Sequence, residues 1–169
     1  MSKEKSALGR VPVPFQSPAE RVDYRALLEA SLATPFAGRR KPWHIVLIQD
    51  PAVLKELGRI IPELAMSRER DPNCAIMICG DRSVKKHLGA LVADCYEATT
   101  SLLHTACCHS LQTEHGRFFP DPERAKRARE LLGIPKHIVP FSVAAFEEDL
   151  DMAASSVADW VGIHMDSWE

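Results

Sequence analysis

Hydrophobic and polar positions follow two rhythms along the chain, and each rhythm predicts a type of element. Compact runs of Ile, Val and Leu indicate strands, whereas apolar residues that recur every three or four positions indicate helices. The expected strands are residues 43–49, 75–79 and 138–146, and the expected helices are residues 18–33, 51–61, 83–111 and 122–132. This order of elements, with more helix than strand, is typical of an α+β or α/β protein.

Other parts of the pattern refine this expectation. Residues 75–79 are apolar throughout, so this strand is expected to be buried on both faces. Residues 62–73 are polar and are expected to form an exposed loop or a short irregular segment. The chain after residue 147 begins with acidic residues and is expected to be weakly helical to about residue 162.

Capping residues mark several helix ends. The segment 17–20, Ser-Pro-Ala-Glu, combines a capping Ser, a Pro at the first helical position and a Glu three residues after the cap. Asp50 and Asp121 each precede a proline. They are expected to cap the helices 51–61 and 122–132. Gly133 follows the last apolar residues of the final helix and is expected to be its C-cap.

The longest predicted helix, residues 83–111, is apolar nearly all the way round. That pattern is typical of a core helix or of a helix at a subunit interface. Asp94 lies within the apolar part of this helix, where a carboxylate must find a partner. We assign Asp94 a structural hydrogen-bonding role and no chemistry.

Composition and charge exclude several classes of protein. The 169 residues are the usual size of one domain, so we treat residues 1–169 as a single domain with a C-terminal extension from about residue 147. The net charge is -2 with acids and bases mixed along the chain, which gives no support to a nucleic-acid or membrane-surface role. No apolar stretch is long enough to span a bilayer. The N-terminus lacks the apolar region of a signal peptide, and five cysteines in apolar surroundings fit reduced thiols, so a cytoplasmic protein is expected.

Four stretches, in this order, carry a resemblance to a known family. Residues 27–43 contain Leu-Leu-Glu-Ala and then Thr-Pro-Phe-Ala-Gly-Arg-Arg-Lys-Pro-Trp, and residues 94–103 form a helix rich in small residues. Residues 129–135 read Arg-Glu-Leu-Leu-Gly-Ile-Pro, and residues 163–168 read Ile-His-Met-Asp-Ser-Trp. Together these stretches resemble the FMN-dependent nitroreductase family over about residues 8–168.

The resemblance implies a fold and an activity. The implied fold is α+β, with a central mixed or antiparallel sheet flanked by helices and a long central helix at the dimer interface. The implied assembly is a homodimer whose C-terminal tails are swapped onto the partner subunit, with one FMN in each of two interface cavities. NAD(P)H would give hydride to the flavin, which would then reduce a small-molecule acceptor such as a nitro compound or a quinone. Because the flavin carries this chemistry, no catalytic side chain is predicted.

The flavin-site motifs of the family match this chain in part. The first motif, Arg-Arg-Ser-x-Arg-x-Phe, aligns with residues 9–15, which read Gly-Arg-Val-Pro-Val-Pro-Phe. Arg10 and Phe15 match. The second, Pro-Ser-Ala-Gly-Asn-x-Gln, meets residues 35–41. The predicted cofactor-binding residues are therefore Arg10, Pro35, Phe36, Gly38, Arg39 and Lys41.

In the second motif, cations stand where the family has amides. Arg39 and Lys41 replace the Asn and the Gln, and Phe36 replaces the Ser. The two cations are predicted to reach the polar edge of the flavin or its phosphate, and a plain solvated basic loop is an equally supported interpretation. In a third motif, at residues 109–116, only Gly116 matches. After the last predicted strand, acidic residues such as Glu147 and Glu148 stand where relatives have basic ones.

Two other interpretations stay open at this point. The chain is alternatively a degenerate member that keeps the fold, has lost FMN and acts as a ligand-binding or interaction protein. His104 and Cys108 lie four residues apart on a helix and are a weak candidate for a metal site, but no metal ligand is predicted. Trp43 is expected to fix the basic loop to the following strand, and Trp168 to clamp the tail onto the partner subunit.

Overall fold

The computed structural model describes residues 24–36, 38–65, 71–148 and 162–168. Four α-helices, one 3-10 helix and five strands lie within these ranges. The helices are α1 (Tyr24–Leu32), α2 (Pro51–Ile60), η1 (Pro62–Ala65), α3 (Leu88–Cys108) and α4 (Pro122–Leu132). The strands are β1 (Trp43–Ile48), β2 (Cys74–Asp81), β3 (Thr113–Arg117), β4 (Ile138–Phe146) and β5 (Ile163–Met165).

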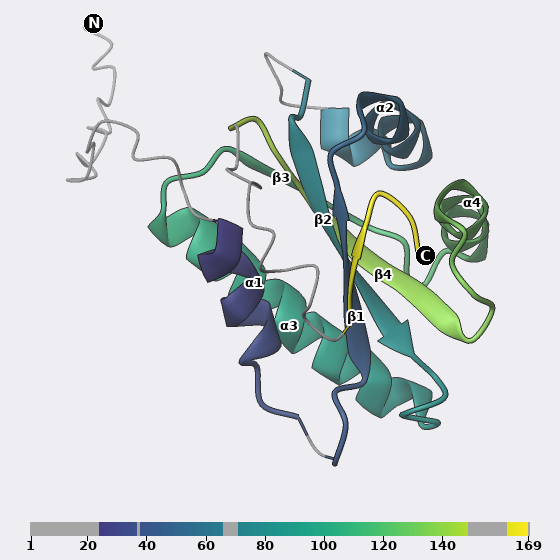
Figure 1. Cartoon of the computed structure of the whole chain (residues 1–169). Helices are drawn as coiled ribbons and strands as arrows, with labels where there is room; N and C mark the ends of the chain where they lie inside the picture. Colours follow the sequence, from purple (N-terminus) through teal and green to yellow (C-terminus); the bar gives the residue numbers. More distant parts are fainter. Residues whose placement is uncertain (1–23, 37, 66–70, 149–161, 169) are drawn as a thin grey trace, which may run out of the picture.

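The strands form one sheet in the order β3-β4-β2-β1-β5 (Figure 1). The pairs β1–β2, β2–β4 and β3–β4 are antiparallel, and β1–β5 is parallel, so the sheet is mixed. The three strands that the pattern predicts form its centre, and all eight residues of β2 are buried. The predicted α+β class and the burial of this strand on both faces are confirmed.

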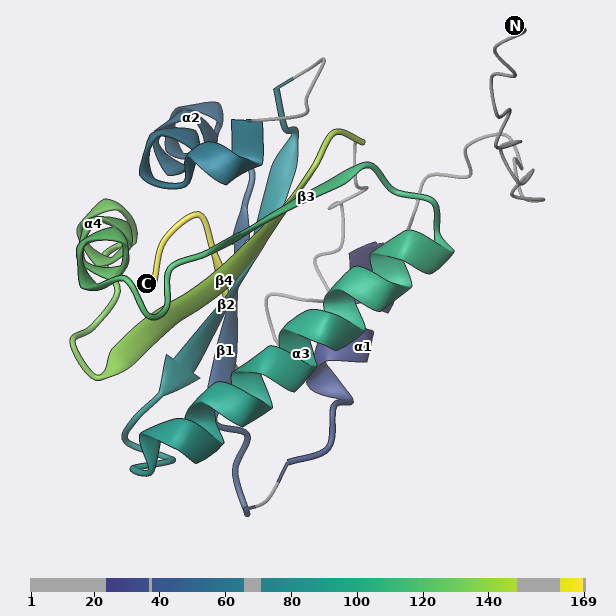
Figure 2. The same ribbon diagram turned by 180° about the vertical axis from the view of Figure 1, so that it is seen from behind.

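Helices cover both faces of the sheet. Figures 1 and 2 show α1 and α3 on one side and α2 and α4 on the other. A hydrophobic core lies on each face of the sheet. Alternate strand residues pack into one core or the other, because successive side chains of a strand point to opposite faces. Ile45 and Leu47 pack with α1 and α3, whereas Val46 and Ile48 pack with α2 and α4.

The predicted caps are present wherever the structure describes them. The side chain of Asp50 accepts a hydrogen bond from the N–H of Ala52, and that of Asp121 accepts from Glu123 and Arg124. Gly133 ends α4 with a φ of 68°, a left-handed conformation that favours glycine. The capping Ser predicted for the first helix, with the rest of segment 17–20, lies outside the described residues.

The start of the long helix differs from the prediction. α3 begins at Leu88 instead of Ser83, because Asp81 holds the preceding residues in a turn. The Asp81 carboxylate accepts from both the N–H and the hydroxyl of Ser83, and His87 caps the helix by accepting from the N–H of Ala90. In the described part of the chain, α3 and the other helices are too short or too polar to cross a bilayer.

Two edge strands and a short helix were absent from the sequence prediction. β3 is polar and pairs with β4 alone, and β5 has only three residues, so neither shows a strand pattern. η1 lies within the segment expected to be an exposed loop, and its Leu64 is buried. The weak helix predicted for the tail falls mainly on residues 149–161, which lie outside the described residues.

The end of the tail lies on the sheet. β5 pairs with β1 of the same chain, and the carboxylate of Asp166 accepts from the N–H groups of Gln49 and Asp50 at 2.6 and 2.9 Å. The backbone N–H of Trp168 donates to the carbonyl of Leu132. The swap of the tail onto a partner subunit stays a prediction, because the contacts described here lie within one chain.

Replacing Gly58 with Ala is expected to raise the free energy of unfolding by about 0.5–1 kcal/mol, because glycine is disfavoured inside a helix such as α2. A methyl group at Gly58 would meet nothing within 4 Å. Gly133 is a matched control, since a methyl group there also meets nothing but the φ is 68°. Chemical denaturation of Gly133→Ala should therefore show a loss of about 1–2 kcal/mol. Equal effects of the two substitutions would contradict this reasoning.

Candidate functional site

The loop between α1 and β1 forms one wall of a cationic hollow. We use this name for the cavity lined by Gly38, Arg39, Arg40, Pro42, Val84 and Lys85, which has a volume of about 220 Å³. Its other wall is the turn between β2 and α3. Gly38 has a φ of 147°, a conformation that side-chain-bearing residues rarely adopt, so glycine is required at this bend.

A hydrogen bond joins the two walls of the cationic hollow, and another holds the turn that forms its second wall. The N–H of Asp81 donates to the carbonyl of Pro42 at 2.7 Å, and the N–H of Lys85 donates to the carbonyl of Asp81 at 3.1 Å. Burial, the largest influence, would raise the pKa of Asp81, but hydrogen bonds from Ser83 and then from His44 outweigh it and lower the pKa. Asp81 therefore stays ionised and holds the turn in place.

The charge of the cationic hollow is positive. Arg39 and Arg40 are exposed, and neither forms an ion pair with any residue that the structure describes. Lys85 forms an ion pair with Asp94, whose side chain is 12% exposed. Three cations thus line the cationic hollow, whose lining includes no carboxylate among the described residues, and the arrangement suits an anion. The predicted structural role of Asp94 is borne out by this ion pair.

Lys41 lies apart from the other cations of the loop. Its Nζ is 5.8 Å from the centre of the Trp43 ring, and burial lowers its pKa. Phe36 contacts the same ring edge-on, with the ring centres 5.5 Å apart. Trp43 is 2% exposed, and its Nε1 has no hydrogen-bond partner among the described residues. Trp43 therefore anchors the loop at the start of β1, as predicted.

The predicted site residues are thus only partly together. Gly38 and Arg39 line the cationic hollow, Phe36 and Lys41 lie against Trp43, and Pro35 is exposed. Arg10 lies outside the described residues. The prediction omitted four residues that line the cationic hollow, and two of these are the cations Arg40 and Lys85. Arg40 adjoins the matched motif, but no sequence pattern places Lys85 beside it.

The acidic residues that follow β4 lie far from the cationic hollow. Cys74, at the start of β2, pairs with Phe146, directly before Glu147 and Glu148. The cationic hollow adjoins Asp81, at the other end of β2. At about 3.3 Å per residue, the two ends of this strand are roughly 23 Å apart. These carboxylates therefore do not offset the charge of Arg39 and Arg40.

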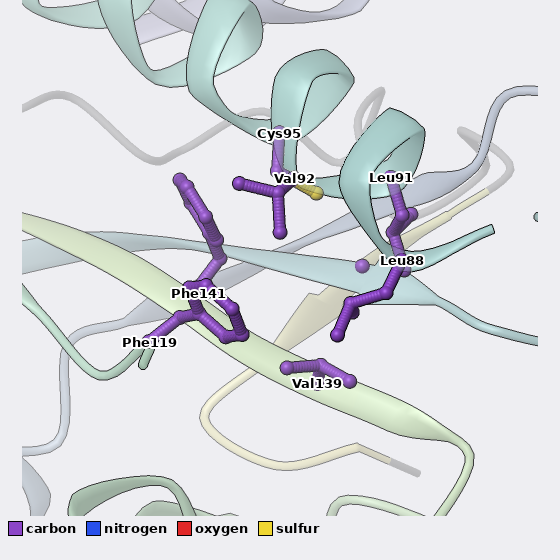
Figure 3. A pocket seen from close by; sticks show the side chains of 8 residues that line it. Leu88, Leu91, Val92, Cys95, Phe119, Val139 and Phe141 are labelled. Carbon is purple, nitrogen blue, oxygen red and sulfur yellow. The ribbon is translucent and has the colours of Figure 1, made fainter. Parts of the chain in front are cut away.

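The cavity under α3 is apolar and small. Figure 3 shows Leu88, Val92 and Cys95 of α3 opposite Val139 and Phe141 of β4. Its volume of about 10 Å³ is at the lower limit for a single water molecule. A planar ring system the size of a flavin does not fit inside it, so this cavity is not a cofactor site within one chain.

Among the described residues, the histidine and cysteine pair at the end of α3 has no third side chain placed as a metal ligand. His104 Nε2 and Cys108 Sγ are 3.9 Å apart, and both Cys107 and Cys108 are exposed instead of packed in an apolar run as expected. Within the described ranges, no group of three His, Cys, Asp or Glu residues is placed to hold a metal ion. Of the three other cysteines, all buried, Cys95 has its pKa raised to about 12 by burial.

Three ring-bearing side chains form a cluster at the edge of the sheet, one each from β1, from β5 and from the residues after β5. His164 stacks on Trp168 with ring centres 3.9 Å apart, and its Nε2 is 3.4 Å from His44 Nδ1. The other ring nitrogen of His44 lies 3.5 Å from the Asp81 carboxylate. In this chain Trp168 therefore packs against His44 and His164 of its own sheet. Its predicted clamping of the tail onto a partner subunit stays a prediction.

Stability is expected to fall as the pH drops below about 6.5, the value of an ordinary histidine in the unfolded chain. Burial, followed by His44, lowers the pKa of His164, and burial, followed by Arg117, lowers that of His115. Below pH 6.5 the unfolded state binds more protons than the folded state. The contribution of these two histidines to stability is therefore fully present above that pH and is lost on acidification. Denaturation at pH 7.5 and 5.5 measures the loss.

The variant His164→Gln serves as the control for this pH dependence. It should reduce the difference in stability between pH 7.5 and 5.5, because one of the two groups no longer titrates. The carboxyl groups of Asp81 and Glu63 have lowered pKa values and titrate below this window. A pH difference that is absent in the parent protein, or unchanged in both His164→Gln and His115→Gln, would contradict the expectation.

Known proteins resemble the chain in sequence and in fold. No protein-family model matches it. A protein of Archaeoglobus fulgidus, provisionally named an NADH dehydrogenase/NAD(P)H nitroreductase, is 33% identical over 130 residues, which is 73% of this chain and 70% of the relative. A Parabacteroides distasonis crystal structure of the same provisional name matches with a TM-score of 0.68 and 27% identity, over 78% of this chain and 76% of that one.

A third match comes from a nitroreductase of Bacteroides fragilis that was crystallised with bound FMN. It has a TM-score of 0.55 and 20% identity over 79% of each chain, and at that identity it shows the fold alone. The nitroreductase fold that the sequence predicts is therefore confirmed. The identity and coverage of the Archaeoglobus relative add evidence from the sequence itself. The chain belongs to the nitroreductase family.

Proposed function

We propose that the protein is an FMN-dependent oxidoreductase that uses NAD(P)H to reduce a small-molecule acceptor, such as a nitro compound or a quinone. The observation that carries the proposal is the cationic hollow at the loop where the family resemblance places flavin contacts. The names of the relatives support the same reaction class, since they refer to NADH, NAD(P)H and nitroreductase activity. The FMN in the Bacteroides fragilis structure supports the choice of cofactor.

The residues present fit the cofactor. FMN carries an anionic phosphate, and Arg39 and Arg40 are cations without carboxylate partners among the described residues. Gly38 keeps the loop backbone open at its bend, and the buried Trp43 holds the loop in position. When bound, FMN supplies the hydride transfer between NAD(P)H and the acceptor. The protein binds and orients it, with Arg10, Pro35, Phe36 and Lys41 as further proposed contacts.

The proposed active form is a homodimer. Leu88 and Tyr96 of α3 are 42% and 60% exposed, and both lie on a helix that resembles the dimer helix of the family. Exposed apolar side chains of this kind are typical of a subunit interface. The cavity under α3 is too small for a flavin, which supports a flavin site completed by a second copy of the chain.

The visible absorption spectrum of the purified protein tests the proposal. The protein is purified from cells supplied with riboflavin, its spectrum is recorded, and apo-protein is then titrated with FMN. We expect about one FMN per chain, followed by NAD(P)H oxidation in the presence of a quinone or a nitro compound. A colourless protein that also ignores added FMN would instead favour the degenerate member that binds another ligand or a partner.

Replacing Arg10 with Ala is expected to weaken FMN binding by about 1.5–3 kcal/mol, the range for a hydrogen bond to a charged group. Arg10 is the one cation of the first phosphate motif that this chain keeps. The fluorescence of free flavin during titration reports the affinity. Riboflavin, which lacks the phosphate, is the control ligand, and its affinity should not change. An unaltered FMN affinity in Arg10→Ala would rule out a phosphate contact.

A further inference from the structure

We propose that His44 and His164 form a proton-sensitive histidine latch that holds β5 on β1, and that a charge on both rings releases residues 162–168 from the sheet. His164 Nε2 and His44 Nδ1 face each other at 3.4 Å, one from each of two paired strands. Figure 1 shows β5, in yellow, beside β1. The inference goes beyond the proposed function and does not depend on it, since it concerns how the tail is held and not a ligand.

The two facing nitrogens of the histidine latch have room for one proton between them. A neutral imidazole has one N–H and one acceptor nitrogen, whereas a charged imidazolium has two N–H groups. With both rings neutral, or with one of them charged, one facing nitrogen can donate and the other can accept. With both rings charged, two N–H groups point at each other across 3.4 Å, and like charges lie on rings whose centres are 5.5 Å apart.

The surroundings of His164 also oppose a charge on its ring. Burial, followed by the charge of His44, lowers the pKa of His164 and outweighs a backbone hydrogen bond with Trp168 that raises it. The indole ring of Trp168 stacks on the imidazole with ring centres 3.9 Å apart, so it covers one face and supplies no carboxylate. A charge on His164 is therefore unfavourable while β5 stays on the sheet, and this penalty disappears once the tail is in water.

One carboxylate faces the histidine latch in the described ranges, and it lies on the side of His44. It belongs to Asp81 of β2, whose Oδ2 is 3.5 Å from His44 Nε2. Within the same ranges, α2 and α4 supply no charged partner to either ring. Asp166, in the same tail, is turned away, because its carboxylate accepts from two backbone N–H groups just before α2. A charged His44 therefore keeps a partner, whereas a charged His164 has none among the described residues.

The short strand β5 is the element that yields. It has three residues and pairs with β1 at the edge of the described sheet, whereas β1 is also held by β2 over six residue pairs. Beyond the strand pairing, the N–H of Asp166 donates to Leu47 and the N–H of Trp168 donates to Leu132. A short edge element with few contacts opens at a low free energy without unfolding the domain. Repulsion within the histidine latch therefore detaches the tail before it disturbs the central strands.

Acid is expected to favour the released tail, because release allows the pair to bind one more proton. A histidine in water has a pKa of about 6.5, and that of His164 on the sheet is lower. The tail is therefore fully held above pH 6.5. Below that pH, each pH unit shifts the equilibrium by up to about 10-fold toward release, until the lowered pKa of His164 is reached.

Hydrogen exchange of the full-length protein, followed by NMR at pH 7.5, 6.5 and 5.5, tests the inference. The backbone N–H groups of Asp166 and Trp168 report on the tail, and those of β2 report on the core. After correction for the pH dependence of exchange in an unstructured chain, protection of the tail groups should change little above pH 6.5. It should fall about 10-fold from pH 6.5 to 5.5. The ring signals of His164 should shift over the same range.

Dilute urea distinguishes release of the tail from unfolding of the whole protein. Release of a short segment exposes little surface, so the exchange rate of Asp166 at pH 5.5 should hardly change in urea. The N–H groups of β2 exchange through unfolding of the domain, which exposes much more surface, so their rates should rise. If the tail and β2 groups exchange at the same rate and respond equally to urea, the inference is wrong.

Three variants assign the effect to the histidine latch. His164→Gln cannot gain a charge, so its tail protection should stay within about 2-fold between pH 6.5 and 5.5. His44→Gln removes the second influence that lowers the pKa of His164, so its loss of protection by pH 5.5 should be smaller than in the parent protein. The matched control is His137→Gln, which removes an exposed histidine just before β4 and should lose tail protection as the parent protein does.

Each remaining outcome also decides the inference. If His164 gains its charge while Asp166 stays protected, both protons fit and the inference is overturned. If His137→Gln abolishes the loss as His164→Gln does, the effect belongs to net charge and the inference is again overturned. If His164→Gln has already lost tail protection at pH 7.5, His44→Gln decides, since a smaller loss than in the parent protein supports the histidine latch and an equal loss contradicts it.

Discussion

Replacing Lys85 with Ala is expected to lower the free energy of unfolding by about 2–3 kcal/mol. The reason is Asp94, which is buried and lies on the side of α3 that packs against the core. Lys85 pairs with it, and without Lys85 a carboxylate stays in an apolar setting with its charge unbalanced. Breaking a fully buried pair costs about 3–5 kcal/mol, and the 17% exposure of the Lys85 side chain places this pair somewhat lower.

Urea denaturation measures the loss, and two variants control for it. Lys86→Ala removes the next cation, which is exposed, and should change stability by less than about 0.5 kcal/mol. The double variant Lys85→Ala/Asp94→Ala removes both charges and should recover part of the loss, because no unpaired charge then remains. A double variant less stable than Lys85→Ala by the full cost of a second independent substitution would contradict the explanation.

Replacing Gly116 with Ala is expected to cost about 1–3 kcal/mol through overpacking. A methyl group on Gly116 would overlap with Cγ2 of Ile61 and would lie 3.5 Å from its Cβ and Cδ1. Ile61 cannot move away easily, because it is fully buried, its branched side chain has few rotamers, and its N–H donates to the carbonyl of Leu57. Gly116 is thus fixed by close contact between β3 and the end of α2.

Thermal denaturation of Gly116→Ala in two backgrounds tests this cause. In the parent protein the substitution should lower Tm by several degrees. In an Ile61→Ala background, which is itself less stable, the same substitution should have almost no further effect, because the overlapping atom is gone. Equal losses in the two backgrounds would show that the cost has another origin. Gly58→Ala, for which no contact is expected, is the control for glycine replacement as such.

The sequence alone predicted the fold class and most helix and strand positions. These predictions rest on signals that lie within a few residues of one another. The Asp caps of α2 and α4 and the C-cap at Gly133 are examples, because a capping side chain bonds to an N–H two or three residues away. The apolar run of β2 is another, since burial on both faces leaves no polar position in the strand.

The family resemblance added the expected cofactor and the loop that carries Gly38 and Arg39. It did not say which cations of that loop lie together. Lys41 is two residues from Arg39, yet it contacts the Trp43 ring, whereas Arg40 lines the cationic hollow. Charges along a loop have no fixed direction in the sequence, because direction depends on the backbone bend at Gly38 and on what each side chain packs against.

What the sequence determined by itself is therefore the set of elements whose stabilising contacts are local, namely the caps, the buried central strands and α4. Only the tertiary structure decided the cationic hollow, the partner of Asp94 and the two edge strands. Lys85 reaches the basic loop because the N–H of Asp81 bonds to Pro42, and polar β3 is a strand because β4 supplies its hydrogen bonds. Contacts between residues far apart in the chain leave no periodic mark in the sequence, so packing alone selects them.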